Sequence, residues 1–172
     1  RLLRLLFFVS LPMAIGGTAI ADSFIGQIYP EYYPNSVSVL IILVWSLPCI
    51  FGNFLLGTIL NATDRQKKNF VASAWAMACN FLLNIPAILY FGANGAAVVT
   101  ILSQGLYFVL IFIYSRDLME WSAVDLKRSV GMLMSAGLMS IVLFSLSLAW
   151  YWEFLIGAVL YSVAMVLFRA VV

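Results

Sequence analysis

Histidine is absent from this sequence, and charged residues make up only 9% of its 172 residues. The missing histidines remove the commonest general base and the commonest metal ligand. The two cysteines, Cys49 and Cys79, stand apart within apolar stretches, where a lone thiol usually packs as a small hydrophobic group. Paired carboxylates and a glycine-rich phosphate loop are also missing from those stretches. We therefore expect a protein that is not an enzyme, with no catalytic residue, metal, cofactor or nucleic-acid partner.

Apolar residues dominate what is present. They make up 65% of the chain, and the mean hydropathy is +1.07, whereas an ordinary soluble domain is about half apolar and about a quarter charged. They form stretches of about 20 residues, the length that a helix needs to cross a hydrocarbon core about 30 Å thick. The six stretches are Leu5–Ile28, Val37–Leu60, Phe70–Phe91, Ala93–Ser115, Val130–Trp150 and Phe154–Val172. The sequence thus predicts an all-α integral membrane protein with six transmembrane helices.

Positive charge is sorted to one side of this six-helix arrangement. All nine lysines and arginines flank the same alternate connections or the two ends of the chain, and they are Arg1, Arg4, Arg65, Lys67, Lys68, Arg116, Lys127, Arg128 and Arg169. In and near the opposite connections, the only charged residues are acidic, namely Asp22, Glu31 and Glu153. Because lysine and arginine are retained on the cytoplasmic side of membrane proteins, we expect both termini in the cytoplasm. The chain is then a multi-pass protein of the cell (cytoplasmic) membrane, in contact with its lipids.

The distribution of polar residues divides the chain into three parts. Residues 1–115 hold four spans with polar faces, residues 116–129 form a cytoplasmic loop, and residues 130–172 hold two peripheral spans. The chain also begins with arginine rather than methionine. Six spans that start and end inside suit most or all of one lobe of a two-lobed exporter fold. We therefore expect a preceding helical lobe in the same chain.

Polar side chains gather in stripes on three successive spans. The stripes comprise Asn53 in the second span, Ser73, Asn80 and Asn84 in the third, and Thr100, Ser103, Gln104 and Tyr107 in the fourth. Residues three or four apart share one helix face, so each stripe points in one direction. The four carboxamide side chains among these residues are Asn53, Asn80, Asn84 and Gln104, and two interpretations of them stay open. They line a hydrophilic cavity that binds sugar hydroxyls or a phosphate, or they join helices through hydrogen bonds worth about 0.6 kcal/mol each.

The charged candidates are one acid and two arginines. Asp22 is the one ionisable residue within a predicted span that is not at its cytoplasmic end. It either couples transport to a cation or reaches the wet interface from near the end of its helix. Arg4 and Arg65 either hold a diphosphate headgroup or set topology by contacting anionic lipid.

Four segments follow one another in an order typical of one family. They are Ile25–Tyr33, Val37–Leu43, Leu60–Lys67 and the stretch from Asn80 through Pro86 to Ala97. With these segments, the chain from Arg4 to Asp117 resembles the C-terminal half of the polysaccharide-biosynthesis flippases. These flippases belong to the multidrug/oligosaccharidyl-lipid/polysaccharide exporter superfamily. Pro30 departs from the pattern, because family members often have glycine before the acidic and aromatic pair.

The resemblance implies a transporter lobe that flips polyprenyl-diphosphate-linked oligosaccharide across the membrane by alternating access. Because this half has no mid-membrane cation, the diphosphate would be held mostly by the preceding part of the chain or by Arg4 and Arg65. Two alternatives stay open. One is a cation-coupled multidrug exporter of the same superfamily, which works through an acid such as Asp22. The other is a non-transporting membrane scaffold that organises the enzymes of glycan assembly.

Overall fold

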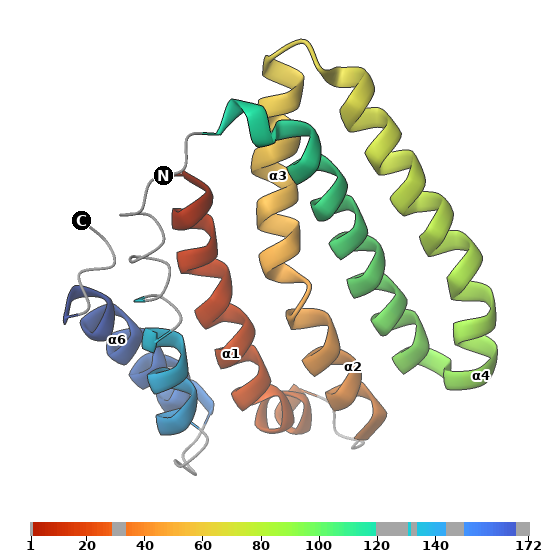
Figure 1. Ribbon diagram of the computed structural model, residues 1–172. Coiled ribbons are helices and arrows are strands. Elements are labelled where there is room, and N and C mark those ends of the chain that lie inside the picture. The colour runs from red at the N-terminus through yellow and green to blue at the C-terminus, as the bar shows by residue number, and fades with distance from the viewer. Residues whose placement is uncertain (1, 29–33, 120–130, 132–133, 144–149, 168–172) are drawn as a thin grey trace.

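Helices make up most of the part of the chain that the structure describes. The computed structural model describes residues 2–28, 34–119, 131, 134–143 and 150–167 (Figure 1). Its elements are α1 (Leu2–Ile28), α2 (Pro34–Val44), α3 (Leu47–Ala62), α4 (Gln66–Ser115), the 3-10 helix η1 (Arg116–Leu118), a short helix Met134–Leu143 and α6 (Trp150–Leu167). Within these residues there is no strand. The expected all-α fold is therefore confirmed for the described residues.

Three of the helical segments are long and apolar enough to cross a membrane. They are Leu2–Ile28, Asn35–Ala62 and Gln66–Leu118, and they contain the first four predicted spans. Large apolar side chains such as those of Trp75, Phe81 and Leu89 are more than half exposed, as expected where lipid replaces water. These helices indicate a membrane-embedded protein. Parts of the fifth and sixth predicted spans, the segment 29–33 and loop residues 120–129 lie outside the described residues.

A sharp turn folds α4 back on itself into two antiparallel arms, residues 66–91 and 93–115 (Figure 1). Gly92 makes the turn with φ 59° and ψ −141°, a conformation that is open essentially to glycine alone. Gly95 then packs directly on the first arm, because a Cβ added there would overlap the Ala87 carbonyl oxygen and lie 2.7 Å from its carbonyl carbon. The turn lies where the sequence separates the third and fourth predicted spans, between Phe91 and Ala93. Gly92 and Gly95 serve different purposes in it.

The second predicted span is broken in its middle. The helix stops after Val44 and resumes at Leu47, and the Ser46 hydroxyl donates a hydrogen bond to the Leu43 carbonyl at 2.6 Å. Pro48 explains the break, because it has no N–H to donate to the carbonyl four residues earlier and its ring crowds that turn. The sequence predicted one continuous helix from Val37 to Leu60, so the structure divides that segment into α2 and α3.

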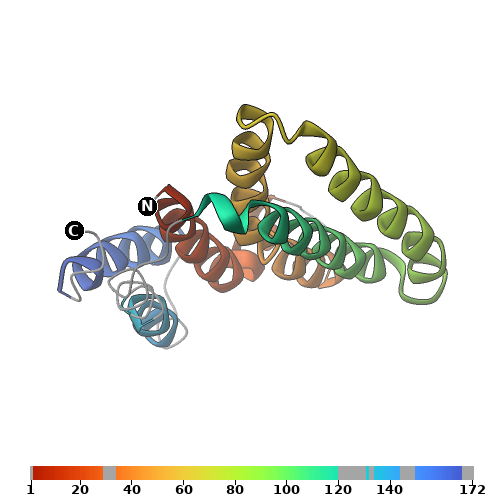
Figure 2. The same cartoon turned by 45° about the horizontal axis from the view of Figure 1, so that its top comes forward.

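α1 separates two groups of packed side chains. On one side, the core of α3 and α4 is formed by Leu56, Leu60, Ala72 and Ile111. On the other side, Ile15 of α1 packs with residues of Met134–Leu143 and α6, namely Ala136, Met139, Leu143 and Tyr161. Figures 1 and 2 show this arrangement, with α6 and the short helix next to α1 and away from α4.

The described cations lie at one end of the helices. The start of α1, the α3–α4 loop and η1 all lie at the upper end in Figure 1. These segments carry Arg4, Arg65, Lys67, Lys68 and Arg116. The Gly92 turn lies at the opposite end. These five cations therefore lie on one side of the helical arrangement, as the sequence predicts.

Candidate functional site

A groove of about 430 Å³ lies between the two arms of α4. The first arm lines it with Ser73, Ala76, Met77 and Asn80, and the second lines it with Thr100, Ser103, Gln104 and Tyr107. The predicted polar stripes of the third and fourth spans therefore face each other. None of the lining residues carries a charge, so the groove is neutral. Six of the eight have polar side chains, although apolar atoms make up more of the groove surface than polar atoms do.

The four predicted carboxamides come together at this groove. Asn53 of α3 donates through Nδ2 to the side-chain Oε1 of Gln104 at 2.8 Å and to its backbone carbonyl at 3.1 Å. Asn80 donates to Ser103 Oγ across the two arms at 2.9 Å. Asn84 donates to Asn80 Oδ1 at 2.9 Å, one helical turn further along the first arm. Asn80 and Gln104 line the groove, while Asn53 and Asn84 are not among its lining residues.

Two carboxamide oxygens of this cluster are buried without a hydrogen-bond partner. They are Oδ1 of Asn53 and Oδ1 of Asn84, and the Asn53 side chain is only 6% exposed. Leaving a buried acceptor unsatisfied costs about 1 to 3 kcal/mol. Both oxygens are enclosed by protein atoms, so this cost falls on the stability of the helix packing.

The hydroxyl groups of the groove donate their protons to protein oxygens. Ser73 donates to Phe70 O at 2.9 Å, Thr100 to Ala96 O at 2.9 Å, and Ser103 to Thr100 O at 3.0 Å. These bonds follow from helix geometry, since a serine or threonine hydroxyl reaches the carbonyl three or four residues earlier. The oxygen lone pairs are left for other partners, apart from the one that Ser103 offers to Asn80.

Tyr107 closes the end of the groove that is nearer the cations. Its hydroxyl donates to Asn69 Oδ1 at 2.6 Å, and Asn69 donates to Asn61 Oδ1 at 3.0 Å. This chain of bonds joins α3 to both arms of α4. A Cβ at Gly57 would lie 3.3 Å from the Tyr107 hydroxyl, so glycine there lets the tyrosine approach α3. The sequence did not indicate the part played by Asn61 and Asn69.

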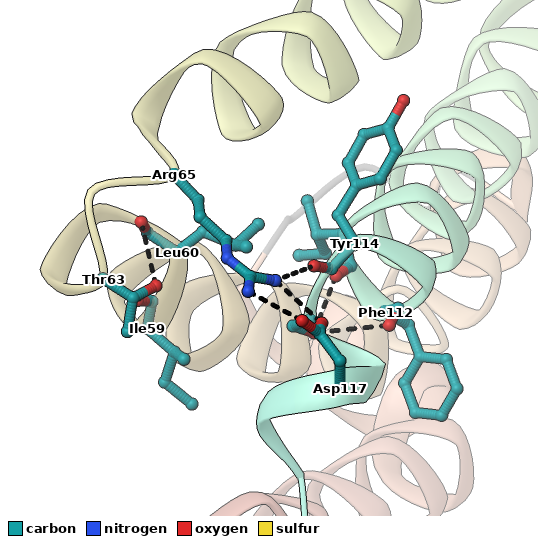
Figure 3. Close-up of polar contacts among 9 residues, drawn as sticks. Ile59, Leu60, Thr63, Arg65, Phe112, Tyr114 and Asp117 are labelled. Atoms are coloured by element: carbon teal, nitrogen blue, oxygen red, sulfur yellow. Dashed lines mark hydrogen bonds and ion pairs between the residues drawn. The ribbon is translucent and has the colours of Figure 1, made fainter.

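An ion pair braces the same end of the arms (Figure 3). Arg65 donates from Nη1 to Asp117 Oδ1, its Nη2 lies against Asp117 Oδ2, and both distances are 2.7 Å. Nη1 also donates to the Tyr114 carbonyl at 3.2 Å. We call this contact the Arg65–Asp117 brace. It ties the α3–α4 loop to the end of the second arm.

The local backbone explains why Arg65 reaches Asp117. α3 ends at Ala62, and Asp64 follows with a φ of 57°, the left-handed conformation that often ends a helix. The Arg65 N–H donates back to the Leu60 carbonyl at 2.9 Å, which completes the turn. Arg65 therefore sits at a fixed place in a tight loop. The sequence did not indicate this part played by Asp117.

No protein-family model, curated protein or solved structure matches this chain.

The remaining predicted site residues lie away from the groove. Arg4 is half-buried near the start of α1, and Asp22 is exposed further along the same helix. Arg65 belongs to the brace at the cationic end. The structure thus gathers the neutral candidates of the sequence and leaves the charged ones outside the groove lining.

The brace predicts a specific dependence on pH. The hydrogen bond from Arg65 lowers the pKa of the Asp117 carboxyl and raises the pKa of the Arg65 guanidinium. Because the folded-state pKa of Asp117 is depressed, the brace contributes fully above the ordinary carboxyl value of 3.8 and is lost as the pH falls through the lowered value. We expect Asp117→Asn to speed hydrogen exchange of the α3–α4 loop amides several-fold at neutral pH.

Asp64→Asn is the matched control for this measurement, because it removes a carboxylate from the same loop without touching the brace. The loop should then exchange as in the wild type. The wild type should match Asp117→Asn only at pH values below 3.8. Equal protection of the wild type and Asp117→Asn at neutral pH would show that the brace does not hold the loop.

Proposed function

We propose that this chain is part of a transporter that flips polyprenyl-diphosphate-linked oligosaccharide across the cytoplasmic membrane by alternating access. The observation that carries the proposal is the polar groove between the arms of α4. Polar side chains within membrane helices carry a free-energy cost unless they pair, bind a ligand or face water. Here they converge from two arms on one groove.

The charge distribution supports the same proposal. The described cations gather at one end of the helices, which in a cytoplasmic membrane is the inner side. A substrate made in the cytoplasm has its diphosphate at that side before transport. The proposal includes six spans with both termini inside and a preceding helical lobe in the same chain, against which this lobe rocks. The order of segments between Ile25 and Ala97 that resembles the flippase family adds to the argument.

One observation favours a scaffold instead. The bonds from Asn53 to Gln104 and from Asn80 to Ser103 join different helical segments, which is what carboxamides do when they only hold helices together. A scaffold in glycan assembly would need these bonds and no groove chemistry. The two functions differ in whether replacing the carboxamides abolishes flipping in a folded protein.

The proposal predicts where lipid-linked oligosaccharide accumulates. In cells that lack the full-length gene and carry no second flippase of this class, completed lipid-linked oligosaccharide should accumulate in the cytoplasmic leaflet. Restoring the gene should relieve the block. The measurement is the amount of the glycolipid by mass spectrometry, together with its accessibility to a membrane-impermeant oxidant.

Normal amounts and sidedness of the glycolipid in the deletion strain would contradict the proposal. The next experiment would then be drug efflux with and without a cation gradient. A multidrug exporter that works through Asp22 predicts efflux that Asp22→Asn abolishes.

A further inference from the structure

The side chains that line the groove have more hydrogen-bond acceptors than donors available to a ligand. The Ser73, Thr100 and Tyr107 hydroxyls all donate to protein oxygens and present lone pairs. The same is true of Ser103, although it already accepts one bond. Donors come from the amide nitrogens of Asn80 and Gln104.

A phosphate would find little in such a groove to bind. Phosphate oxygens only accept hydrogen bonds, and proteins hold them with arginine, lysine or a row of backbone N–H groups. The groove lining has no cation, and its backbone N–H groups are bonded within the two helical arms. Lone pairs of the hydroxyls would repel phosphate oxygens.

A sugar fits the same groove well. Each sugar hydroxyl is both a donor and an acceptor, so it can give its proton to Ser73, Thr100 or Tyr107 and accept from an amide. The apolar Ala76 and Met77 in the lining suit the C–H faces of a sugar ring. The volume of about 430 Å³ lies in the range of about 300 to 1,000 Å³ that is typical of small-molecule sites.

We infer that the groove between the arms of α4 binds the uncharged, hydroxyl-rich sugar part of the substrate and excludes the diphosphate. This inference rests on the proposed function and assigns one part of the substrate to this groove. The diphosphate then has to be held elsewhere. Sugar binding and diphosphate binding would then take place at different sites rather than in a single cationic cavity.

The test uses the full chain in lipid nanodiscs, with Cys49 and Cys79 replaced by alanine and with Ser73→Cys introduced. Ser73 is exposed and lines the groove, so the new thiol should react with N-ethylmaleimide. The probes are farnesyl β-glucoside, farnesyl diphosphate and farnesol, which share one chain and differ in the headgroup. We expect the glucoside to slow labelling about tenfold relative to farnesol, as one or two net hydrogen bonds would.

Farnesyl diphosphate should slow labelling no more than farnesol does. Protection by the diphosphate equal to or greater than that by the glucoside would overturn the inference, and so would equal protection by all three probes. Thr58→Cys is the matched control, because Thr58 is exposed on α3 outside the groove lining. Labelling at that position should be the same with every probe.

A second variant, Met77→Lys, tests the cause of the exclusion. Met77 lines the groove and is 71% exposed, so a lysine there adds a cation with little change in packing. Protection by farnesyl diphosphate should appear in this variant and not in its parent. Equal protection in the two proteins would count against the inference.

Failure of the inference and failure of the proposed function give different results. If the glucoside protects the groove while the deletion strain flips its glycolipid normally, the groove binds sugars and the transport function is wrong. If the deletion strain is blocked and the diphosphate protects the groove, the transport function stands and the assignment of the sugar to the groove is wrong.

Discussion

Replacing Gly95 by alanine is expected to destabilise the protein by about 3 kcal/mol or more, at the upper end of what overpacked sites usually show. The added Cβ would overlap the Ala87 carbonyl oxygen. The obstacle is backbone, so no side chain can rotate out of the way. The arms of α4 would have to separate near their turn, and the groove between them would lose its shape. The measurement is the free energy of unfolding of the full chain in detergent micelles.

Gly105→Ala is the matched control. Gly105 lies in the same arm, and nothing stands within 4 Å of a Cβ added there. Alanine favours helix over glycine by about 1 kcal/mol, so this variant should be unchanged or slightly more stable. If both variants unfold alike, the close approach of the arms at Gly95 is not what holds the hairpin.

The second large effect is expected from replacing Asn80, Asn84 and Gln104 together by leucine. These substitutions remove the amide donors of the groove and the bonds that Asn80 makes to Ser103 and that Asn53 makes to Gln104. Flipping should fall at least about tenfold, since substrate hydrogen bonds are worth about 1 kcal/mol each and 1.4 kcal/mol is a factor of ten. Stability should fall much less, because interhelical bonds in membranes average about 0.6 kcal/mol.

Flipping is measured as transfer of lipid-linked oligosaccharide out of the cytoplasmic leaflet, in cells that make equal amounts of folded protein. The control is Ser140→Leu with Ser162→Leu. These serines lie in Met134–Leu143 and α6, where their hydroxyls donate to carbonyls of their own helices, Gly137 O and Ala158 O. The control should flip normally. Normal flipping by the folded triple variant would favour the scaffold over the transporter.

The sequence predicts the helices and the groove stripes well because both depend on local periodicity. Ser73 and Asn80 share a face of the first arm, and Thr100, Ser103 and Tyr107 share a face of the second. The turn between the arms then brings the two faces together. Gly92, in a charge-free stretch between two apolar runs, marked that turn.

The features that the sequence did not reveal depend on contacts between distant residues. Arg65 and Asp117 are 52 residues apart, and a charge in a loop is usually solvated. The break at Ser46 was also missed, since a proline in an apolar run often only bends a membrane helix. The bonds from Asn53 to Gln104 depend on the packing of α3 against the second arm, which periodicity within one helix does not predict.

The arms of α4 are fastened at both ends, by the Gly92 turn at one end and by Tyr107, Asn69 and the Arg65–Asp117 brace at the other. A groove between two arms that are held at both ends widens most easily between those ends, when one arm bends. Pro86 lies in the first arm, where it removes one backbone hydrogen bond and softens the helix. Bending at Pro86, between the groove lining and the Gly92 turn, would therefore move the first arm without releasing either fastening.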